Sequence, residues 1–330
     1  GAYKKIATIK TTSYTDTGAT TAGAQYSYRV YAYRTVNKVT YKSAASEAYT
    51  GCRLGQAKIS SAANGATGIT VKWGAVASAT GYYVYRSTGS GSYTQIAAVT
   101  GRSYVDTEAV TNGTRYRYKV AAVFEDGETT YKGAASGIYT IYCVERPSVT
   151  VTNGSSAVSV KWNVIGSATG YYVYRSVNGG KYQKLATVTT TSYTDKKATT
   201  AGATYRYKIY AYRTISGTTY QSGGSDAGTV YRLTRPAIAA VGSDESGTMR
   251  VSWKKNAYAT GYEVQYSQTS DFAEAQTVEI DSADTLETTV EELTGDTTYY
   301  VRIRNCYSTE EVTSYSAWSV AKSIVVAEEE

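Results

Sequence analysis

The sequence predicts an all-β chain made of tandem two-sheet sandwiches, and three observations support this prediction. The chain of 330 residues contains 36 Tyr and 4 Trp, and it is rich in Thr, Val and Ser, which suit pleated strands. Its motifs recur about every 90 residues. Each repeat holds roughly seven short alternating segments separated by Gly- or Asn-containing turns, a pattern typical of a β-sandwich.

The repeat is defined by four motifs, which follow one another along the chain. The first is a tryptophan strand, found as Val71-Lys72-Trp73, Val160-Lys161-Trp162 and Val251-Ser252-Trp253. The second is an Ala-Thr-Gly-Tyr step at residues 79–82, 168–171 and 259–262. The third is Ser-Tyr-x-Asp at residues 13–16, 103–106 and 192–195. The fourth alternates with a period of two and starts at Tyr26, Tyr116, Tyr205 and Tyr299.

Together these motifs resemble the fibronectin type III module. The resemblance rests on a tryptophan in the second strand, Gly-Tyr-x-Val in the third and the alternating tyrosine motif in the sixth, and it covers essentially the whole chain. It implies immunoglobulin-like β-sandwiches of fibronectin type III topology. The segment from Leu293 to Tyr299 is similar to that family's approach to the sixth strand, which implies a tyrosine corner at Tyr299 and at its counterparts Tyr26, Tyr116 and Tyr205.

A second resemblance concerns the source. The segment Tyr315-Ser316-Ala317-Trp318-Ser319 is similar to type III repeats of large extracellular proteins from Gram-positive gut and soil bacteria, and the composition, with many tyrosines and 2 prolines, fits that group. The resemblance implies a secreted or cell-surface bacterial protein. The sequence lacks Arg-Gly-Asp, so integrin binding through that motif is not expected.

The module boundaries are predicted from the repeat and from proline. Pro147 and Pro236 stand where one repeat ends and the next begins, a position that proline tolerates. We predict complete modules at 55–146, 147–235 and 236–330, the last with an acidic tail. Linkers of a few residues predict end-to-end stacking as a semi-rigid rod on the order of 110 Å long.

Residues 1–54 are predicted to be a partial module that lacks the first three strands. Its inward face would carry Tyr26, Tyr28, Val30 and Ala32, and a small isolated sheet is only marginally stable. We therefore expect something to cover this face, such as a neighbouring module, a separate fragment or a second copy through self-association. The alternative is a chain end that simply falls inside the module.

Composition argues against several classes of function. The net charge of +7 is not gathered in one basic run, so a nucleic-acid partner is not expected. No apolar stretch is long enough to predict a membrane span. The absence of histidine removes Ser-His-Asp triads, Cys-His pairs and histidine metal sites. We expect no enzyme, no cofactor and no metal site.

Three groups of reactive side chains have structural interpretations. Cys52 and Cys143 occupy matching repeat positions and are interpreted as small strand hydrophobes, with a redox or metal role as the alternative. Asp16, Asp106 and Asp195 recur directly after a strand and are interpreted as turn caps rather than catalysts. The acidic cluster is interpreted as a solvated face rather than a calcium site, and it comprises Asp281, Asp284, Glu287, Glu291 and Glu292.

One surface is a candidate binding site. Strand alternation should place a set of aromatic and cationic side chains outward on one sheet of the second and third modules. The set is Tyr83, Tyr85, Arg117, Lys119, Tyr172, Tyr174, Arg206, Lys208, Tyr210 and Tyr212. The fourth module has Glu263 and Gln265 instead of outward tyrosines. The set either packs across strands, at about 0.2–1 kcal/mol per pair, or binds sugar rings or protein partners.

Two hypotheses of function therefore stand. The first is a spacer or stalk that projects other domains of a cell-surface or secreted protein. The second is an adhesin or carbohydrate-binding accessory that uses the aromatic face, with a cell-surface protein, matrix protein or glycan as its partner. The near identity of the second and third modules favours the spacer, because repeating a whole module requires only packing.

Overall fold

The computed structural model describes residues 1–127 and 129–328, and its regular elements over these residues are 28 β-strands, β1 to β28. None of the described residues belongs to a helix of the length and hydropathy that crossing a membrane requires. The chain forms two compact units, residues 1–145 with 220–222 and residues 146–219 with 223–330. The prediction of an all-β chain is confirmed.

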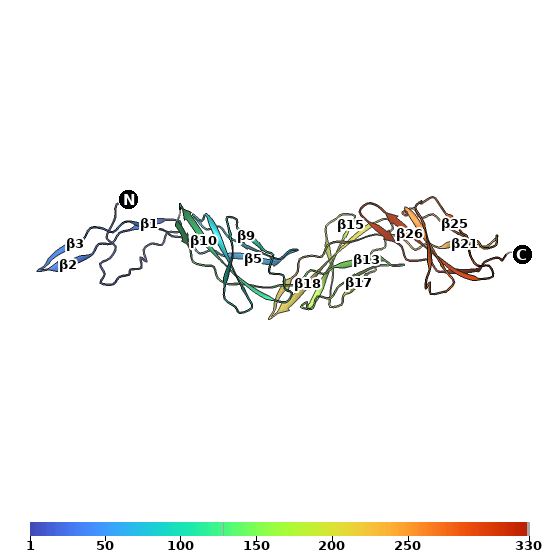
Figure 1. The fold of residues 1–330 in the computed structure, drawn as a ribbon, viewed down its shortest axis with the longest axis horizontal. Helices are drawn as coiled ribbons and strands as arrows, with labels where there is room; N and C mark the ends of the chain where they lie inside the picture. Colours follow the sequence, from blue (N-terminus) through green and yellow to red (C-terminus); the bar gives the residue numbers. More distant parts are fainter. Residues whose placement is uncertain (128, 329–330) are drawn as a thin grey trace. The chain divides into compact units, whose positions relative to one another are not determined.

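We call the predicted ranges 55–146, 147–235 and 236–330 modules 2, 3 and 4 (Figure 1). Each of them holds one three-stranded and one five-stranded sheet. In module 2 the three-stranded sheet has the order β5-β6-β9, and the other has the order β11-β10-β7-β8 with β12 also on β10. Its strands are β5 (Ile59–Asn64), β6 (Ile69–Trp73), β7 (Gly81–Thr88), β8 (Thr94–Val99), β9 (Ser103–Asp106), β10 (Arg115–Asp126), β11 (Thr129–Lys132) and β12 (Tyr139–Tyr142).

Modules 3 and 4 repeat this plan. The strands of module 3 are β13 (Val149–Asn153), β14 (Val158–Trp162), β15 (Gly170–Val177), β16 (Gln183–Val188), β17 (Ser192–Asp195), β18 (Thr204–Ile215), β19 (Thr218–Gln221) and β20 (Gly228–Tyr231). Those of module 4 are β21 (Ile238–Gly242), β22 (Met249–Trp253), β23 (Gly261–Ser267), β24 (Gln276–Ile280), β25 (Glu287–Val290), β26 (Thr298–Ser308), β27 (Thr313–Tyr315) and β28 (Lys322–Val325).

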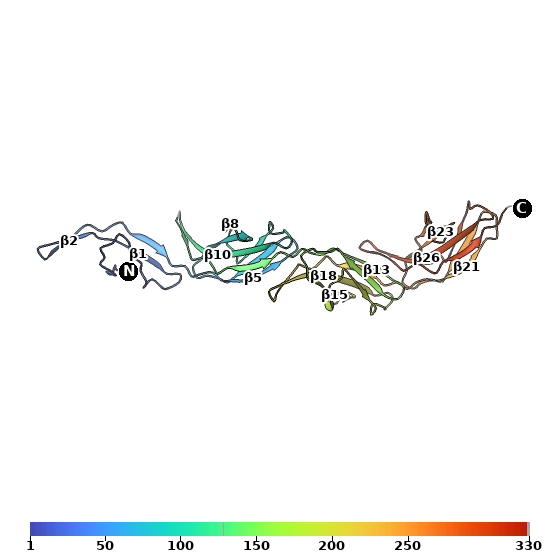
Figure 2. The same ribbon diagram turned by 90° about the horizontal axis from the view of Figure 1, so that it is seen from below.

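Residues 1–54, here module 1, contain two short ribbons and no sandwich. β1 (Gln25–Tyr28) pairs with β4 (Tyr49–Cys52), and β2 (Tyr33–Val36) pairs with β3 (Val39–Lys42). Figures 1 and 2 both show the β2–β3 ribbon set apart from β1 by strandless chain. That these residues are a partial module without its first three strands stays a prediction.

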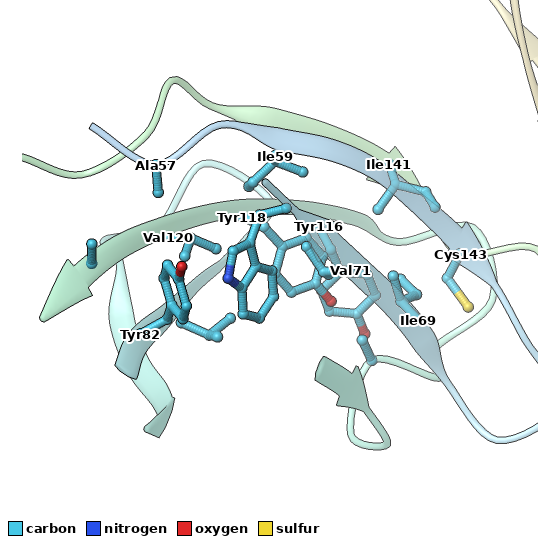
Figure 3. Packing of buried hydrophobic residues seen from close by; sticks show 14 of the residues in the cluster. Ala57, Ile59, Ile69, Val71, Tyr82, Tyr116, Tyr118, Val120, Ile141 and Cys143 are labelled. Atoms are coloured by element: carbon cyan, nitrogen blue, oxygen red, sulfur yellow. The ribbon is translucent and has the colours of Figure 1, made fainter. Parts of the chain in front are cut away.

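The core of module 2 lies between its two sheets and consists of the residues that the alternation placed inward. Tyr118, Val120 and Val84 are fully buried, and Tyr82 and Tyr116 are nearly so. Figure 3 shows the tyrosines and Val120 converging with Ile59, Ile69 and Val71 from the facing sheet. Period-two alternation works here because successive side chains of a strand point to opposite faces of its sheet.

The tyrosine corner implied by the family resemblance is present. The backbone N–H of Thr294 donates to Tyr299 Oη over 3.2 Å, and Thr200 donates to Tyr205 Oη over 3.2 Å. The partial module retains it, with a distance of 3.3 Å from Thr21 N to Tyr26 Oη. Each bond ties the start of the long sixth strand to the turn that precedes it.

Candidate functional site

The five-stranded sheet of module 3 gathers most of the predicted site. In the register of β15 and β18, Tyr172 lies opposite Tyr210 and Tyr174 lies opposite Lys208. Arg206 is exposed, and the other predicted side chains of this module are half-buried, namely Tyr172, Tyr174, Lys208, Tyr210 and Tyr212. The structure thus brings these residues onto one outward face, where they contact one another.

The ring of Tyr172 is contacted from both neighbouring strands. Tyr212 of β18 stacks on it with a centroid distance of 4.5 Å and an angle of 15° between the rings. From β16, the ammonium group of Lys184 lies 3.8 Å from the ring centroid. Tyr172 is therefore held between an aromatic and a cationic neighbour, which is cross-strand packing of the stabilising kind.

The other rings of this face also have close partners. Tyr174 and Tyr210 meet edge to face at 5.2 Å, and Lys208 Nζ lies 5.1 Å from the ring centroid of Tyr182. A Cβ on Gly224 would lie 2.8 Å from the ring of Tyr210, so this ring rests directly on glycine backbone. Packing thus occupies much of the surface that a ligand would need.

In module 2 the predicted tyrosines have small or cationic neighbours instead of aromatic ones. Tyr83 is half-buried, and its cross-strand neighbours are the small residues Ala98 and Ala121. Tyr85 lies opposite Lys119, and its ring has the ammonium group of Lys132 at 5.1 Å. The two remaining predicted residues converge elsewhere: Arg117 and Lys119 approach the ring of Tyr93 at 5.4 and 4.5 Å.

Module 4 replaces the tyrosine face with a stack of alternating cations and rings. Arg302 lies between Phe272 and Trp318, at 4.0 and 4.7 Å from their centroids, and Arg304 lies between Trp318 and Tyr315, at 4.4 and 3.8 Å. Two carbonyl-bearing side chains then hold the guanidinium groups. Glu263 Oε2 accepts from Arg304 at 2.6 Å, and Gln265 Oε1 accepts from Arg302 at 2.7 Å. The expected loss of the tyrosine face in this module is therefore accompanied by a different packed surface.

In modules 2 and 3, the two sheets of each sandwich are joined by a buried ion pair that was not predicted from the sequence. Asp106 caps its turn as predicted, by accepting from the backbone N–H of Glu108 at 3.3 Å. The same carboxylate also accepts from Arg86 Nη1 at 2.8 Å and from Tyr118 Oη at 2.7 Å. Burial, followed by the adjacent Asp106, raises the pKa of Tyr118 above its ordinary value.

Module 3 repeats this arrangement, and module 4 replaces all of it. Asp195 accepts from Arg175 at 2.8 Å and from Tyr207 at 2.8 Å. At the matching positions module 4 has apolar or aromatic side chains, namely Tyr266, Val290 and Val301. The three positions thus change together, as expected when a buried charge cannot be left without its partner. This joint change is the sequence signal that could have revealed the contact.

The cysteines and the acidic cluster show no arrangement for chemistry. The described cysteines are free thiols, and burial raises the pKa of Cys143 to about 11, which lowers its reactivity. Within the acidic cluster, Asp284 pairs with Lys255, and Glu287 lies 3.5 Å from Arg250. Over residues 1–127 and 129–328, no group of His, Cys, Asp and Glu side chains is arranged to hold a metal ion.

Modules 3 and 4 contact each other through hydrogen bonds and a stacked pair of rings. The β26–β27 hairpin of module 4 lies against β20 of module 3, and the ring of Tyr307 stacks on Tyr231 at 3.7 Å and 14°. The Tyr231 N–H donates to Ser314 Oγ at 3.0 Å. Asn153 spans both modules, since its Nδ2 donates to the carbonyl oxygens of Tyr231 at 2.8 Å and Tyr315 at 3.0 Å.

Arg232 fixes the turn that carries Asn153. Its guanidinium is 3% exposed and donates to Asn153 Oδ1 at 3.2 Å and to the carbonyl oxygen of Gly154 at 2.9 Å. Burial lowers the pKa of Arg232. Because this side chain joins the residue that follows β20 to the turn after β13, Asn153 is presented to module 4 from a rigid base.

A second point of contact lies on a glycine turn. Gly202 of module 3 has a φ of +77°, and a Cβ added there would lie 2.4 Å from the ring of Tyr258 in module 4. The equivalent contact between modules 1 and 2 joins Gly23, with a φ of +82°, to Ser78. There, Ser78 Oγ donates to the Gly23 carbonyl oxygen at 3.3 Å. The same two turns thus meet in both pairs of modules.

The chain has partial similarity to known proteins. No family model matches it. It is 30% identical over 233 residues to Exoglucanase B of Cellulomonas fimi, a match that covers 63% of this chain and 20% of that protein. The chain therefore spans about a fifth, 20%, of the length of this relative.

Among solved structures, the FN1-FN3 domains of chicken CNTN1 match 83% of this chain and 98% of their own, with 18% identity and a TM-score of 0.32. A two-domain fibronectin type III segment of chicken tenascin matches 55% of this chain and 99% of its own, with 16% identity and a TM-score of 0.28. The sheet orders are those of the fibronectin type III sandwich. Modules 2, 3 and 4 are tandem sandwiches of this topology.

Proposed function

We propose that this chain is a non-catalytic spacer in an extracellular bacterial multidomain protein, either secreted or cell-surface and of the Gram-positive type. Its role is to hold other domains apart through tandem modules, of which modules 3 and 4 are fixed to each other. The observation that carries this proposal is the junction of modules 3 and 4, where Asn153 donates to carbonyl groups of both modules.

The junction favours a spacer because two elements of module 3 hold module 4. The Tyr231–Tyr307 stack comes from β20, and the Gly202–Tyr258 contact comes from the turn at Gly202. Flexibly linked modules do not need such contacts, because interfaces between domains that move are ordinarily small and polar. The match to 20% of a large exoglucanase is consistent with a connecting region.

The test is small-angle X-ray scattering of the full chain and of the double variant Asn153→Ala and Tyr307→Ala. A spacer predicts an extended wild type, with a maximum dimension on the order of 110 Å or more, and a broader distribution of dimensions for the variant. Wild-type chains that fold back, with a maximum dimension near that of two modules, would contradict the proposal.

A second candidate function is binding of a glycan or a host protein by the outward face of module 2. The observation in its favour is the setting of Tyr83 between Ala98 and Ala121, whereas the matching Tyr172 of module 3 lies opposite Tyr210. Aromatic rings beside cationic side chains suit sugar rings and protein partners alike. The remaining face residues would then support this site by packing.

This candidate is tested on a glycan and matrix-protein array. The wild type is compared with the variant in which Tyr83, Tyr85, Tyr172 and Tyr174 are all changed to Ser, after circular dichroism has shown that the variant is folded. The matched control changes only Tyr172 and Tyr174. Binding that is lost with the four changes and kept in the control places the site on module 2, and binding by none of the proteins contradicts it.

A further inference from the structure

Four asparagines of the chain are followed directly by glycine, a pair of residues that can modify itself. The pairs are Asn64-Gly65, Asn112-Gly113, Asn153-Gly154 and Asn178-Gly179. In such a pair the backbone nitrogen of the glycine can attack the side-chain carboxamide, because the chain holds the two groups close together and glycine has no Cβ to obstruct the approach. The sequence makes the four pairs equivalent, so the structure decides which of them reacts.

The attacking nitrogen is already engaged in three of the four pairs. In each of these three, the glycine N–H donates to a backbone carbonyl oxygen at 2.7 or 2.8 Å, namely Gly65 to Gly68, Gly113 to Cys143 and Gly154 to Ala157. The asparagines of these pairs are also half-buried. Attack requires the nitrogen to lose its proton and to turn toward the side chain, so each of these hydrogen bonds must open before the pair can react.

The asparagine side chains of two of these pairs are fixed as well. Asn64 Nδ2 donates to the carbonyl oxygen of Tyr142 at 3.0 Å. Asn153 Nδ2 donates to the carbonyl oxygens of Tyr231 and Tyr315 at the junction of modules 3 and 4. Because the reaction releases this nitrogen as ammonia, it would also break these bonds.

The pair Asn178-Gly179 differs from the other three. It lies in the turn between β15 and β16, and both of its residues are exposed. No group among the described residues accepts a hydrogen bond from the Gly179 N–H. A Cβ added to Gly179 would have no neighbour within 4 Å, so the space beside its backbone is open. The nitrogen of this glycine is therefore free to react.

The carboxamide of Asn178 is held by a donor that favours the attack. The backbone N–H of Thr204 donates to Asn178 Oδ1 at 2.9 Å. When a nucleophile adds to the carboxamide carbon, negative charge develops on this oxygen, and an N–H group already aimed at it stabilises that charge. This pair thus combines an unengaged nucleophile with an oriented donor to the oxyanion.

We propose that Asn178 is a site of self-modification, at which the folded chain converts the side-chain amide into a carboxylate. The Gly179 nitrogen gives its proton to hydroxide and bonds to Cγ of Asn178, and the bond from Cγ to Nδ2 breaks with release of ammonia. Water then opens the five-membered imide at either of its carbonyl groups. One opening leaves an aspartate, and the other leaves an isoaspartate, which adds one carbon atom to the main chain.

The modification should alter the outward face of module 3. The turn at Asn178 leads into β16, whose Lys184 ammonium group lies 3.8 Å from the ring centroid of Tyr172. A longer main chain in this turn displaces the start of β16 and so loosens that contact. The register of the long strands places Gly89 of module 2 at the matching position, where this reaction is impossible.

The test is peptide mapping by mass spectrometry after the folded full chain has been kept in mildly alkaline buffer. We expect Asn178 to be converted at least about tenfold faster than the other three asparagines, because their reaction requires a hydrogen bond to open first. A parallel sample in concentrated urea should show four similar rates, because unfolding removes these hydrogen bonds. Fragmentation that separates the two isomers should detect isoaspartate at position 178.

The control variant Asn178→Gly carries the residue that module 2 has at this position. Amide exchange of β16 should become faster as the wild type ages and stay constant in the variant. A folded chain in which another Asn-Gly pair reacts first, or in which all four react equally, would overturn the proposal. Conversion of Asn178 without any isoaspartate would overturn the role of the Gly179 nitrogen, because only the imide yields that isomer. Unchanged exchange in the aged wild type would overturn the effect on module 3.

Discussion

Tyr118 and Asp106 lie in opposite sheets of module 2 and are joined by a hydrogen bond of 2.7 Å in the core. Asp106 is 1% exposed and Tyr118 fully buried, so the bond links the two layers where water does not reach. Arg86 completes the contact from the strand beside Tyr118. The sandwich of modules 2 and 3 is therefore held by a polar centre as well as by apolar packing.

Removing parts of this centre should have unequal effects. Tyr118→Phe loses one hydrogen bond to a charged group and should lower the free energy of unfolding of module 2 by about 1.5–3 kcal/mol. Asp106→Ala leaves Tyr118 Oη without its acceptor and Arg86 with only the exposed Glu108, and it should cost about 3–5 kcal/mol. Amide exchange of β7 and β10 measures both.

The matched control for this prediction is taken from module 4. The triple change Arg86→Tyr, Asp106→Val and Tyr118→Val installs the set that module 4 carries at these positions. It should be less destabilising than Asp106→Ala alone, because no buried charge is left unpaired. If the loss of unfolding free energy in the triple variant equalled the sum of the losses in the three single variants, the idea that these positions must change together would be contradicted.

Stability should also depend on pH in a defined direction. Folding raises the pKa of Tyr118 and Tyr207, mainly through burial and then through Asp106 and Asp195. The unfolded chain releases these protons near pH 10 and the folded chain holds them, so the contribution is complete below about pH 10 and is lost as pH rises further. Each tyrosine should add a slope of up to about 1.4 kcal/mol per pH unit. Urea unfolding from pH 8 to 11.5 should show a shallower decline for Tyr118→Phe; equal slopes would contradict the argument.

The sequence predicted those features of the fold that depend on neighbouring residues of one strand, and not those that depend on distant parts of the chain. Alternation placed Tyr82, Val84, Tyr116 and Tyr118 correctly, because neighbouring residues of a strand alone decide which face a side chain occupies. The partner of Asp106 depends on how two sheets pack, which no local period encodes. Only a comparison with module 4, where Val290 and Val301 replace Asp106 and Tyr118, contains that information.

The predicted site shows the same limit. Strand alternation was sufficient to place the tyrosines of module 3 outward on one face. The contact of Tyr172 with Tyr212 is diagonal in the register, so it depends on side-chain rotamers rather than on strand position. At the junction, Asn153 looks in the sequence like an ordinary turn residue. Its contact with Tyr315 spans 162 positions of the chain and requires two folded modules.

A pair of glycines separates backbone strain from contact between modules. Gly202 and Gly179 have the same φ of +77°, but an added Cβ at Gly179 would have no neighbour within 4 Å, whereas at Gly202 it would meet Tyr258. Both alanine variants should share a strain of about 1 kcal/mol. Only Gly202→Ala should also loosen the junction, as measured by faster exchange of the Tyr231 amide. The second change Tyr258→Ala should restore it, and failure to do so would argue against this contact.

The tyrosine faces of modules 2 and 3 should differ in their contribution to stability. Tyr172→Ser removes contacts with Tyr212 and Lys184 and should destabilise module 3 by about 2 kcal/mol. Tyr83→Ser removes a ring flanked by alanines and should cost module 2 less than about 1 kcal/mol. Denaturant midpoints followed by exchange in each module test the difference. If Tyr83→Ser were the more destabilising of the two changes, the tyrosines of module 3 could no longer be interpreted as stabilising cross-strand packing.

The central claim is that contacts such as those of Asn153 and Tyr307 fix one module to the next. It is tested most directly by electron-resonance distance distributions between spin labels on Lys161 of module 3 and Lys254 of module 4, in a chain whose native cysteines are replaced. We predict a single narrow distribution for the otherwise wild-type chain, and a clearly broader one when Asn153→Ala and Tyr307→Ala are introduced. A broad wild-type distribution, or a narrow one that the two changes leave unaltered, would contradict the account.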